Sequence, residues 1–238
     1  VVCCGGDGTF NETLSGLLSA ESKTPIGYIP TGSTNDFASS LKLPLDVLEA
    51  TKNIIEGQPV PYDAGRFGGR VFSYVASFGA FTRTSYTTPQ SIKNALGHTA
   101  YVLEGIQELT QIRNEHIKMI VDGEVVEDDF LFGAICNSTS VGGVLTLDPD
   151  VVDLQDNKLE ILLVRAPRNL AELHECILAL QDQTYNCAML PFRSATHIRI
   201  FADPEMPWTL DGEREEGHSE VEVVPEHLAY RLMKRVQP

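Results

Sequence analysis

The first third of the chain alternates between the apolar repeats of strands and helices. Residues 1–4 form a short β-prone apolar run, a glycine-rich stretch follows, and apolar residues then recur at the spacing of one helical face. That face consists of Phe10, Leu14, Leu17 and Leu18. The pattern predicts a strand, a glycine loop and a helix that begins near Thr9 or Asn11.

The same order of elements repeats immediately. Residues 25–29 read as a strand, residues 30–34 as a loop, and Asn35-Asp36 as the cap of a short helix. A third helix is expected over residues 45–56 and ends at Gly57. Two consecutive strand–helix units predict a Rossmann-like parallel sheet.

The pattern changes after Pro59, where we place a domain boundary. Strand-like runs follow at residues 71–78, 116–121, 130–137, 158–164 and 197–201. Two amphipathic helices, over residues 91–112 and 169–181, interrupt them. We therefore expect an α/β domain (residues 1–59), an antiparallel, sandwich-like β-rich domain (60–225) and a C-terminal tail (226–238) that can rejoin the first domain.

Charge and cysteine content narrow the class of protein. The 238 residues carry a formal net charge of −15, which argues against a nucleic-acid partner because such proteins use surplus Lys and Arg on phosphates. Five cysteines without a CxxC pair indicate a reducing compartment. No apolar run approaches the roughly 18 residues of a membrane span, so the expected location is cytoplasmic.

The first glycine loop, residues 5–12 (GGDGTFNE), has the chemistry of an anion site. Glycines let the backbone approach a ligand closely, and the following helix directs unpaired N–H groups at the loop. Asp7 can hold Mg²⁺ or order the loop, and Thr9 adds a hydroxyl donor. The loop is neither a P-loop nor a GxGxxG fingerprint, and alone it is equally compatible with a structural turn.

The second loop, residues 30–37 (PTGSTNDF), follows the next strand. Because parallel strands end at the same edge, both loops are expected to face one crevice. An N-cap cluster is the alternative interpretation of its Ser-Thr-Asn-Asp stretch.

GGDGTFNE followed by PTGSTNDFA resembles the soluble bacterial diacylglycerol kinase family, which is related to sphingosine, ceramide and NAD kinases. The resemblance covers essentially the whole chain. It implies ATP and Mg²⁺ as cofactors, with Asp7 and Asp36 as partners of the catalytic Mg²⁺ and Ser33 where the commoner pattern has Thr. The implied nucleotide-binding residues are Gly6, Asp7, Gly8, Thr9, Phe10, Asn11, Glu12, Ser33 and Asp36.

The family also has a catalytic glutamate in a late Asp-Gly-Glu motif, and this tripeptide occurs twice here. Residues 122–124 lie between two strand-like runs, where Asp-Gly predicts a hairpin turn. Residues 211–213 stand where the family motif belongs. The resemblance therefore assigns Glu213 as the general base.

An acidic stretch at residues 148–159 fails the EF-hand pattern, because Val152 and Leu159 occupy ligand positions. It is similar to a family turn that holds a structural Mg²⁺. Carried over, Asp156 supplies a carboxylate, and Asp153 and Lys158 supply carbonyls. The alternative, that this stretch is a plain solvated acidic turn without a metal, stays open.

These expectations combine into an ATP- and Mg²⁺-dependent lipid kinase that converts diacylglycerol to phosphatidic acid at the membrane periphery. The alternatives are another acceptor (a sphingoid base, phosphatidylglycerol or NAD) and a nucleotide- or lipid-binding module without catalysis. Relatives carry further strand–helix units before the first loop, so we expect the parallel sheet to be N-terminally incomplete. A homodimer stays open. Three basic clusters are candidate membrane contacts: Arg66/Arg70, Arg165/Arg168 and Arg231/Lys234/Arg235.

Overall fold

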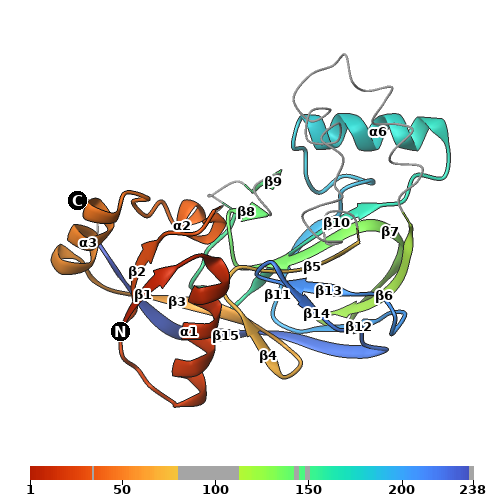
Figure 1. Cartoon of the computed structure of the whole chain (residues 1–238). Coiled ribbons are helices and arrows are strands. Elements are labelled where there is room, and N and C mark those ends of the chain that lie inside the picture. Colours follow the sequence, from red (N-terminus) through yellow and green to blue (C-terminus); the bar gives the residue numbers. More distant parts are fainter. Residues whose placement is uncertain (34, 80–112, 142–144, 148–150, 236–238) are drawn as a thin grey trace.

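The computed structural model describes residues 1–33, 35–79, 113–141, 145–147 and 151–235. It contains a small parallel sheet with helices, followed by a large curled antiparallel sheet (Figure 1). The predicted fold class is confirmed. The helix expected over residues 91–112, which includes Tyr101, lies outside the described residues.

The parallel part begins with β1 (Val2–Gly5), which pairs with β2 (Gly27–Pro30). Its helices are α1 (Asp7–Ser19), α2 (Asp36–Ser40) and α3 (Val47–Glu56). Helix α1 begins two residues earlier than the first predicted start, because Gly6 rather than a polar residue is its N-cap. Helix α3 begins at Val47 because the Asp46 side chain accepts hydrogen bonds from the Leu48 and Glu49 amides.

The antiparallel sheet confirms the prediction that the second part of the chain is rich in β-strands. Its first strands are β3 (Gln58–Phe67), β4 (Arg70–Phe72), β5 (Val75–Gly79), β6 (Glu115–Val121), β7 (Glu124–Cys136) and β10 (Leu159–Arg165). The later ones are β11 (Phe192–Ala195), β12 (Ile198–Phe201), β13 (Trp208–Leu210), β14 (Glu213–Glu215) and β15 (Glu220–Lys234). Short β8 (Ser140–Val141) pairs with β9 (Leu145–Thr146), and α6 (Leu170–Gln181) begins after its N-cap Asn169.

Strand β15 joins the two parts. It pairs with β3 along almost its whole length and continues through residue 225 without a break. Near its end, the Ile26 amide donates to Arg231 O at 2.8 Å and the Met233 amide donates to Ile26 O at 2.8 Å. The C-terminal end of β15 therefore lies beside β2, and Figure 1 shows β15 and β3 running from one part into the other.

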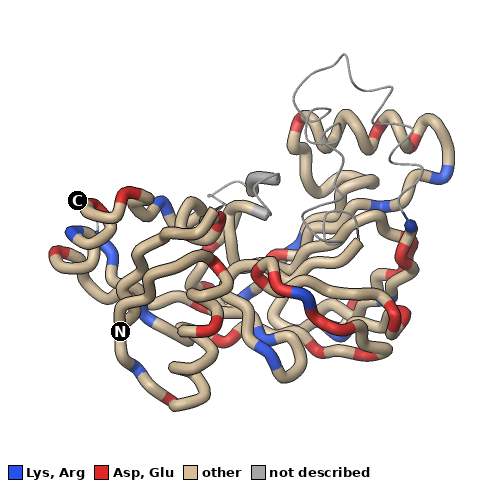
Figure 2. Tube along the Cα trace, viewed as in Figure 1, with Lys and Arg blue, Asp and Glu red and all other residues tan. Residues whose placement is uncertain are grey.

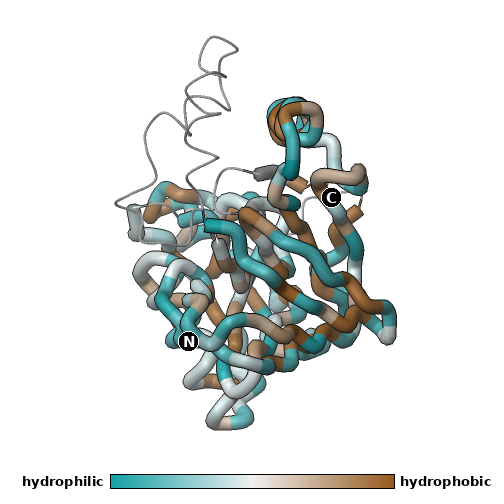
Figure 3. The backbone as a smooth tube through the Cα atoms, turned by 90° about the vertical axis from the view of Figure 1, so that its right-hand side faces the viewer, coloured by the Kyte–Doolittle hydropathy of each residue, from teal (hydrophilic) through white to brown (hydrophobic). Residues whose placement is uncertain are grey.

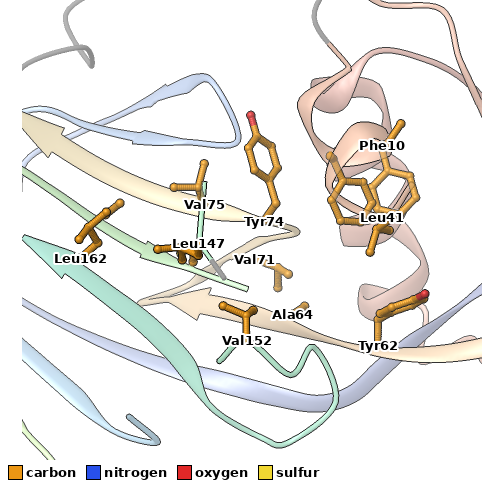
Figure 4. Close-up of a cluster of buried hydrophobic side chains, with 14 of the residues drawn as sticks. Phe10, Leu41, Tyr62, Ala64, Val71, Tyr74, Val75, Leu147, Val152 and Leu162 are labelled. Carbon is orange, nitrogen blue, oxygen red and sulfur yellow. The ribbon is translucent and has the colours of Figure 1, made fainter. Parts of the chain in front are cut away.

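Apolar side chains form two cores, as expected for strands that alternate between two faces. One lies within the curled sheet around Trp208, whose ring is 4.8 Å from that of Phe67 and 5.0 Å from that of Phe78. Trp208 is therefore a packing residue of this core. The other core spans both parts, and Figure 4 shows Phe10 of α1 and Leu41, which follows α2, on one side and strand residues such as Val71 on the other. Figure 3 shows the same alternation of apolar and polar positions along the strands.

Candidate active site

The two glycine loops touch at the carboxyl ends of β1 and β2. Gly5 is paired with Pro30, and the Thr31 amide donates to Gly5 O at 2.8 Å. A Cβ at residue 32 would lie 2.5 Å from Gly6 Cα, and a Cβ at residue 6 would lie 3.2 Å from Gly32 Cα. Glycine is required at residue 32 because two backbones pass there without room for a side chain.

The N-terminus of α1 opens beside these loops. Its N-cap Gly6 has no side chain, and the first intrahelical hydrogen bond is donated by Phe10 N to Gly6 O at 3.1 Å. The amides of Asp7, Gly8 and Thr9 donate to no described residue. Together with the helix dipole, three open amides are suited to binding an anion.

Asp7 connects the first loop to the second. Its buried carboxylate accepts from the Asp36 amide at 3.0 Å and the Phe37 amide at 3.2 Å, at the start of α2. Burial raises the pKa of Asp7, and these two hydrogen bonds oppose the rise. Of the two roles predicted for Asp7, ordering the loop is therefore visible; magnesium binding stays a prediction.

The second loop is shaped by Asn35. Its backbone is left-handed, with φ of 53°, and its side chain accepts from Gly32 N and donates to Gly32 O, both at 2.8 Å. Ser33 is exposed, and Asp36 is half-buried with no ion pair to a described residue. Burial also raises the pKa of Asp36.

The hairpin of β13 and β14 places Glu213 over the N-terminus of α1. Asp211 and Gly212 form its turn with φ of 50° and 86°. Glu213 is exposed, and its Oε1 lies 3.1 Å from the position that a Cβ on Gly8 would take. The general base expected from the family resemblance thus lies against the open helix end, 205 residues away in sequence.

Three other residues expected at the nucleotide, Phe10, Asn11 and Glu12, lie beyond the open amides of the first loop. Phe10 is fully buried, with its ring 4.9 Å from Tyr28 and 4.6 Å from Phe37. Asn11 is buried and its side chain bonds to Asp211, whereas Glu12 is exposed. The loop amides up to Thr9 are open, and from Phe10 onward the amides belong to the helix.

The first Asp-Gly-Glu copy is the hairpin turn that the sequence predicts. Asp122 and Gly123 have φ of 47° and 91°, close to those of the second copy. The Asp122 carboxylate accepts from Thr196 N and Oγ1 and from His197 N. Glu124 is exposed and pairs with Arg193 at 3.0 Å. The two Asp-Gly-Glu copies therefore form similar turns, but their side chains contact different residues.

Buried hydroxyls lie beside the carboxylates of the two loops. Tyr74 is buried and its pKa is raised well above its ordinary value by burial and by nearby Asp211, Asp7 and Asp36. Figure 4 shows Tyr74 rising from the sheet beside the helices. The buried Tyr28 hydroxyl has no hydrogen bond to a described residue and also feels the charge of Asp7.

The carboxylates of Asp7 and Asp36 together are suited to binding a divalent cation. Asp7 and Asp36 repel each other, and neither forms a salt bridge with a described basic side chain. Carboxylate oxygens are the ligands that Mg²⁺ prefers. Within the described ranges no group of three or more His, Cys, Asp or Glu side chains is arranged as a ligand set, so this pair needs oxygens from water or phosphate to complete a coordination shell.

The predicted structural metal turn is held by protein contacts in its described residues, 151–159. Asp153 accepts from Gln155 N at 3.0 Å, and Asp156 accepts from Lys158 N at 3.0 Å. Asp156 Oδ2 also lies 3.4 Å from Lys158 Nζ. Asn157 adopts a φ of 62°, in the left-handed region that asparagine tolerates better than most residues. The metal at Asp153, Asp156 and Lys158 stays a prediction.

Sequence reasoning missed Asp63. This fully buried carboxylate accepts from Asn157 N at 2.7 Å, Leu228 N at 2.6 Å and His227 Nδ1 at 3.1 Å. It therefore ties the acidic turn to β3 and to the irregular pairing of β15. A lone Asp inside an apolar strand pattern was the available signal, because a buried charge requires partners.

The three basic clusters all have partners on the protein. Arg66 pairs with Glu226 and Arg70 with Glu215. Arg165 and Arg168 share Asp128. In the C-terminal cluster, Arg231 and Lys234 donate to the backbone carbonyls of residues 23 and 41, and Arg235 pairs with Glu56 at 2.6 Å.

Figure 2 shows Asp and Glu positions along the strands of the antiparallel sheet, with Lys and Arg positions among them. Among helices in the described part of the chain, none combines the length and the apolar character that crossing a bilayer requires.

Comparison with known proteins gives consistent matches along the chain. The family described as "Diacylglycerol kinase catalytic domain" matches residues 1–67, and the "YegS C-terminal NAD kinase beta sandwich-like domain" matches residues 75–231. A protein of Bacillus subtilis named diacylglycerol kinase is 32% identical over 215 residues, covering 90% of this chain and 70% of its own. One of the same name from Staphylococcus carnosus is 34% identical over 214 residues, covering 90% of this chain and 69% of its own.

Among solved structures, a putative diacylglycerol kinase from Bacillus anthracis str. Sterne aligns with a TM-score of 0.77 at 23% identity. The alignment covers 98% of this chain and 77% of that chain. This likeness supports the fold described above.

Proposed function

The chain belongs to the diacylglycerol kinase family, and from that premise we propose that it transfers the γ-phosphate of ATP to the free hydroxyl of diacylglycerol, forming phosphatidic acid. The observation that carries the proposal is the position of Glu213, a carboxylate on a separate hairpin that lies against Gly8 at an open helix N-terminus. An anion site and a candidate base therefore face each other across one short gap.

The open amides of Asp7, Gly8 and Thr9 would bind phosphate oxygens of ATP. Helix N-termini stabilise such groups through free N–H donors and the helix dipole. At their tight crossing, Gly6 and Gly32 have no side chains of their own to cover the loops. The exposed hydroxyl of Ser33 lies in the second loop and can add a further donor.

Asp7 and Asp36 would hold the catalytic Mg²⁺. When bound, the cation supplies neutralisation of the phosphate charge, which phosphoryl transfer requires. Asp7 at the same time keeps the two loops in register through its bonds to the Asp36 and Phe37 amides.

Glu213 would accept the proton of the acceptor hydroxyl. The hydroxyl oxygen forms a bond to the γ-phosphorus, the bond to the bridging oxygen of the β-phosphate breaks, and ADP leaves. The released proton passes to the Glu213 carboxylate. Positioning within hydrogen-bond reach is the main requirement for such a base.

Diacylglycerol is a membrane lipid, so the proposal includes peripheral contact of the protein with a bilayer surface on the cytoplasmic side. The relatives named diacylglycerol kinase support this acceptor over the alternatives. A homodimer is compatible with the proposal, which requires only one copy of the site.

A panel of acceptors tests the function. The protein is incubated with radiolabelled ATP, Mg²⁺ and mixed micelles that contain diacylglycerol, a sphingoid base or phosphatidylglycerol, and with NAD in solution. We expect label in phosphatidic acid. Label in another product would show that the protein uses a different acceptor. ATP binding without transfer to any acceptor would indicate a non-catalytic module.

A further inference from the structure

The carboxylate of Asp211, in the turn of the β13–β14 hairpin, is buried and held by many hydrogen bonds. Asp211 is 2% exposed, and its carboxylate accepts five hydrogen bonds. The donors are Ser73 N at 2.5 Å, Ser73 Oγ at 2.8 Å, Tyr74 N and Val75 N at 3.0 Å each, and Asn11 Nδ2 at 2.6 Å. Burial raises the pKa of Asp211, and the bonds from the donors oppose that rise. A carboxylate held by five donors has little freedom to move.

Only one of these five donors comes from the parallel part. Ser73 and Tyr74 connect β4 to β5, and Val75 is the first residue of β5, which pairs with β13 of the hairpin, whereas Asn11 is on α1. The Asn11 amide also donates to Val71 O at 3.0 Å, so both of its hydrogens are used. Asn11 therefore connects the helix of the anion site with the hairpin that carries Glu213.

Asn11 and Gly8 are one helical turn apart and lie on the same face of α1. Gly8 meets Glu213 and Asn11 meets Asp211, two residues earlier on the hairpin. The helix and the hairpin thus contact each other at two successive points. A change at Asn11 would alter the distance between the Glu213 carboxylate and the open amides.

The hairpin turn itself does not need this bond. Asp122 makes the same turn with similar φ, but its carboxylate is exposed and bonds to Thr196 and His197. The turn is specified locally by Asp-Gly, and the buried contacts of Asp211 are additional. Those contacts serve the tertiary placement of the hairpin.

We propose that Asn11 is a positioning residue that holds the catalytic Glu213 over the N-terminus of α1 by donating a hydrogen bond to Asp211. The inference rests on the proposed function, in which Glu213 is the base. It goes beyond that function by assigning a role in the transfer step to a buried amide that is bonded to Val71 and Asp211.

Replacement of Asn11 by alanine tests the proposal. Alanine is the strongest helix former, so α1 is retained. Because a displacement of about 1 Å can cost roughly 100-fold in rate, we expect kcat of Asn11→Ala to fall by about 10- to 100-fold. KM for ATP should change little, since the open amides are untouched. Asp122→Asn is the matched control: it weakens the other Asp-Gly turn and should lower the melting temperature without lowering kcat.

A double-mutant cycle separates positioning from general destabilisation. If Asn11 acts through Glu213, Asn11→Ala should have no further effect on the residual rate of Glu213→Gln. An equal loss in both backgrounds, or a wild-type kcat for Asn11→Ala, would overturn the proposal. If Glu213→Gln loses turnover while Asn11→Ala does not, only the positioning role fails. Full turnover in Glu213→Gln would overturn the proposed base and this inference with it.

Discussion

The side chain of Glu213 lies in tight contact with the position that a Cβ on residue 8 would take. Its Oε1 lies 3.1 Å from the ideal Cβ position of Gly8, and its Cγ and Cδ lie 3.8 and 3.9 Å away. Gly8, the third glycine of the first loop, thus permits a carboxylate from the other end of the chain to reach the helix N-terminus. This relationship gives the first prediction.

Gly8→Ala should separate activity from stability. The added methyl group displaces the Glu213 carboxylate, so we expect turnover to fall by about tenfold or more. Stability should be retained, since alanine is favoured over glycine in a helix. Gly16→Ala is the matched control on the same helix: no heavy atom lies within 4 Å of its added Cβ. Gly16→Ala should stabilise the protein by about 1 kcal/mol with wild-type turnover. Equal turnover in both variants would contradict the contact between Glu213 and Gly8.

Gly32→Ala should separate the two loops. Its Cβ would lie 2.5 Å from Gly6 Cα, and a backbone atom cannot move aside as a side chain can. We expect a loss of about 1–3 kcal/mol in the free energy of unfolding, together with weaker ATP binding by calorimetry. Gly69→Ala, with nothing within 4 Å, should leave both quantities unchanged. A Gly32→Ala protein with normal ATP affinity would show that the loop crossing does not form the nucleotide site.

Glu160 should make stability depend on pH. Burial raises its pKa from an ordinary 4.5 to about 8, and the Ser194 hydroxyl only partly offsets this. Between these values the folded protein keeps a proton that the unfolded chain releases, so the free energy of unfolding falls as pH rises. The full difference is of order 5 kcal/mol. Urea unfolding should find Glu160→Gln more stable than wild type at pH 9 and nearly equal at pH 5. An equal difference at both pH values would contradict this account.

Magnesium should stabilise the acidic turn if the metal site carried over from the family is present. The melting temperature of the wild type would then rise with Mg²⁺, and Asp156→Asn would remove that rise. A wild-type melting temperature that Mg²⁺ and chelators leave unchanged would identify the turn as one held by Asp63, Asn157 and Lys158 alone.

The sequence predicts the elements of the fold well because the local signals are strong. Glycine loops between a strand and a helical repeat fix the first units, and Asp-Gly between apolar runs fixes the hairpin at residues 122–123. The start of α1 was misplaced by two residues, since a bare Gly6 cap leaves no polar signal.

The site was predictable only in its local parts. Both loops can be read from glycine and helix-start chemistry, and Glu213 required the family resemblance because its turn is locally identical to that of Asp122. The bond between Asn11 and Asp211 joins residues 200 positions apart, and no periodicity encodes such a contact. The partners of Asp63 are also distant in sequence, at 94 and 165 positions, and its place in an apolar strand pattern was its local signal.

The most direct test of the account is the turnover of two matched glutamate variants, one in each Asp-Gly-Glu copy. Glu213→Gln removes the proposed base at the helix end, whereas Glu124→Gln changes an exposed glutamate paired with Arg193. We measure kcat for transfer from ATP to diacylglycerol, with ATP affinity by calorimetry as the control. The account predicts a loss of about 100-fold or more for Glu213→Gln with ATP affinity retained, and wild-type turnover for Glu124→Gln. Wild-type turnover in Glu213→Gln would contradict it.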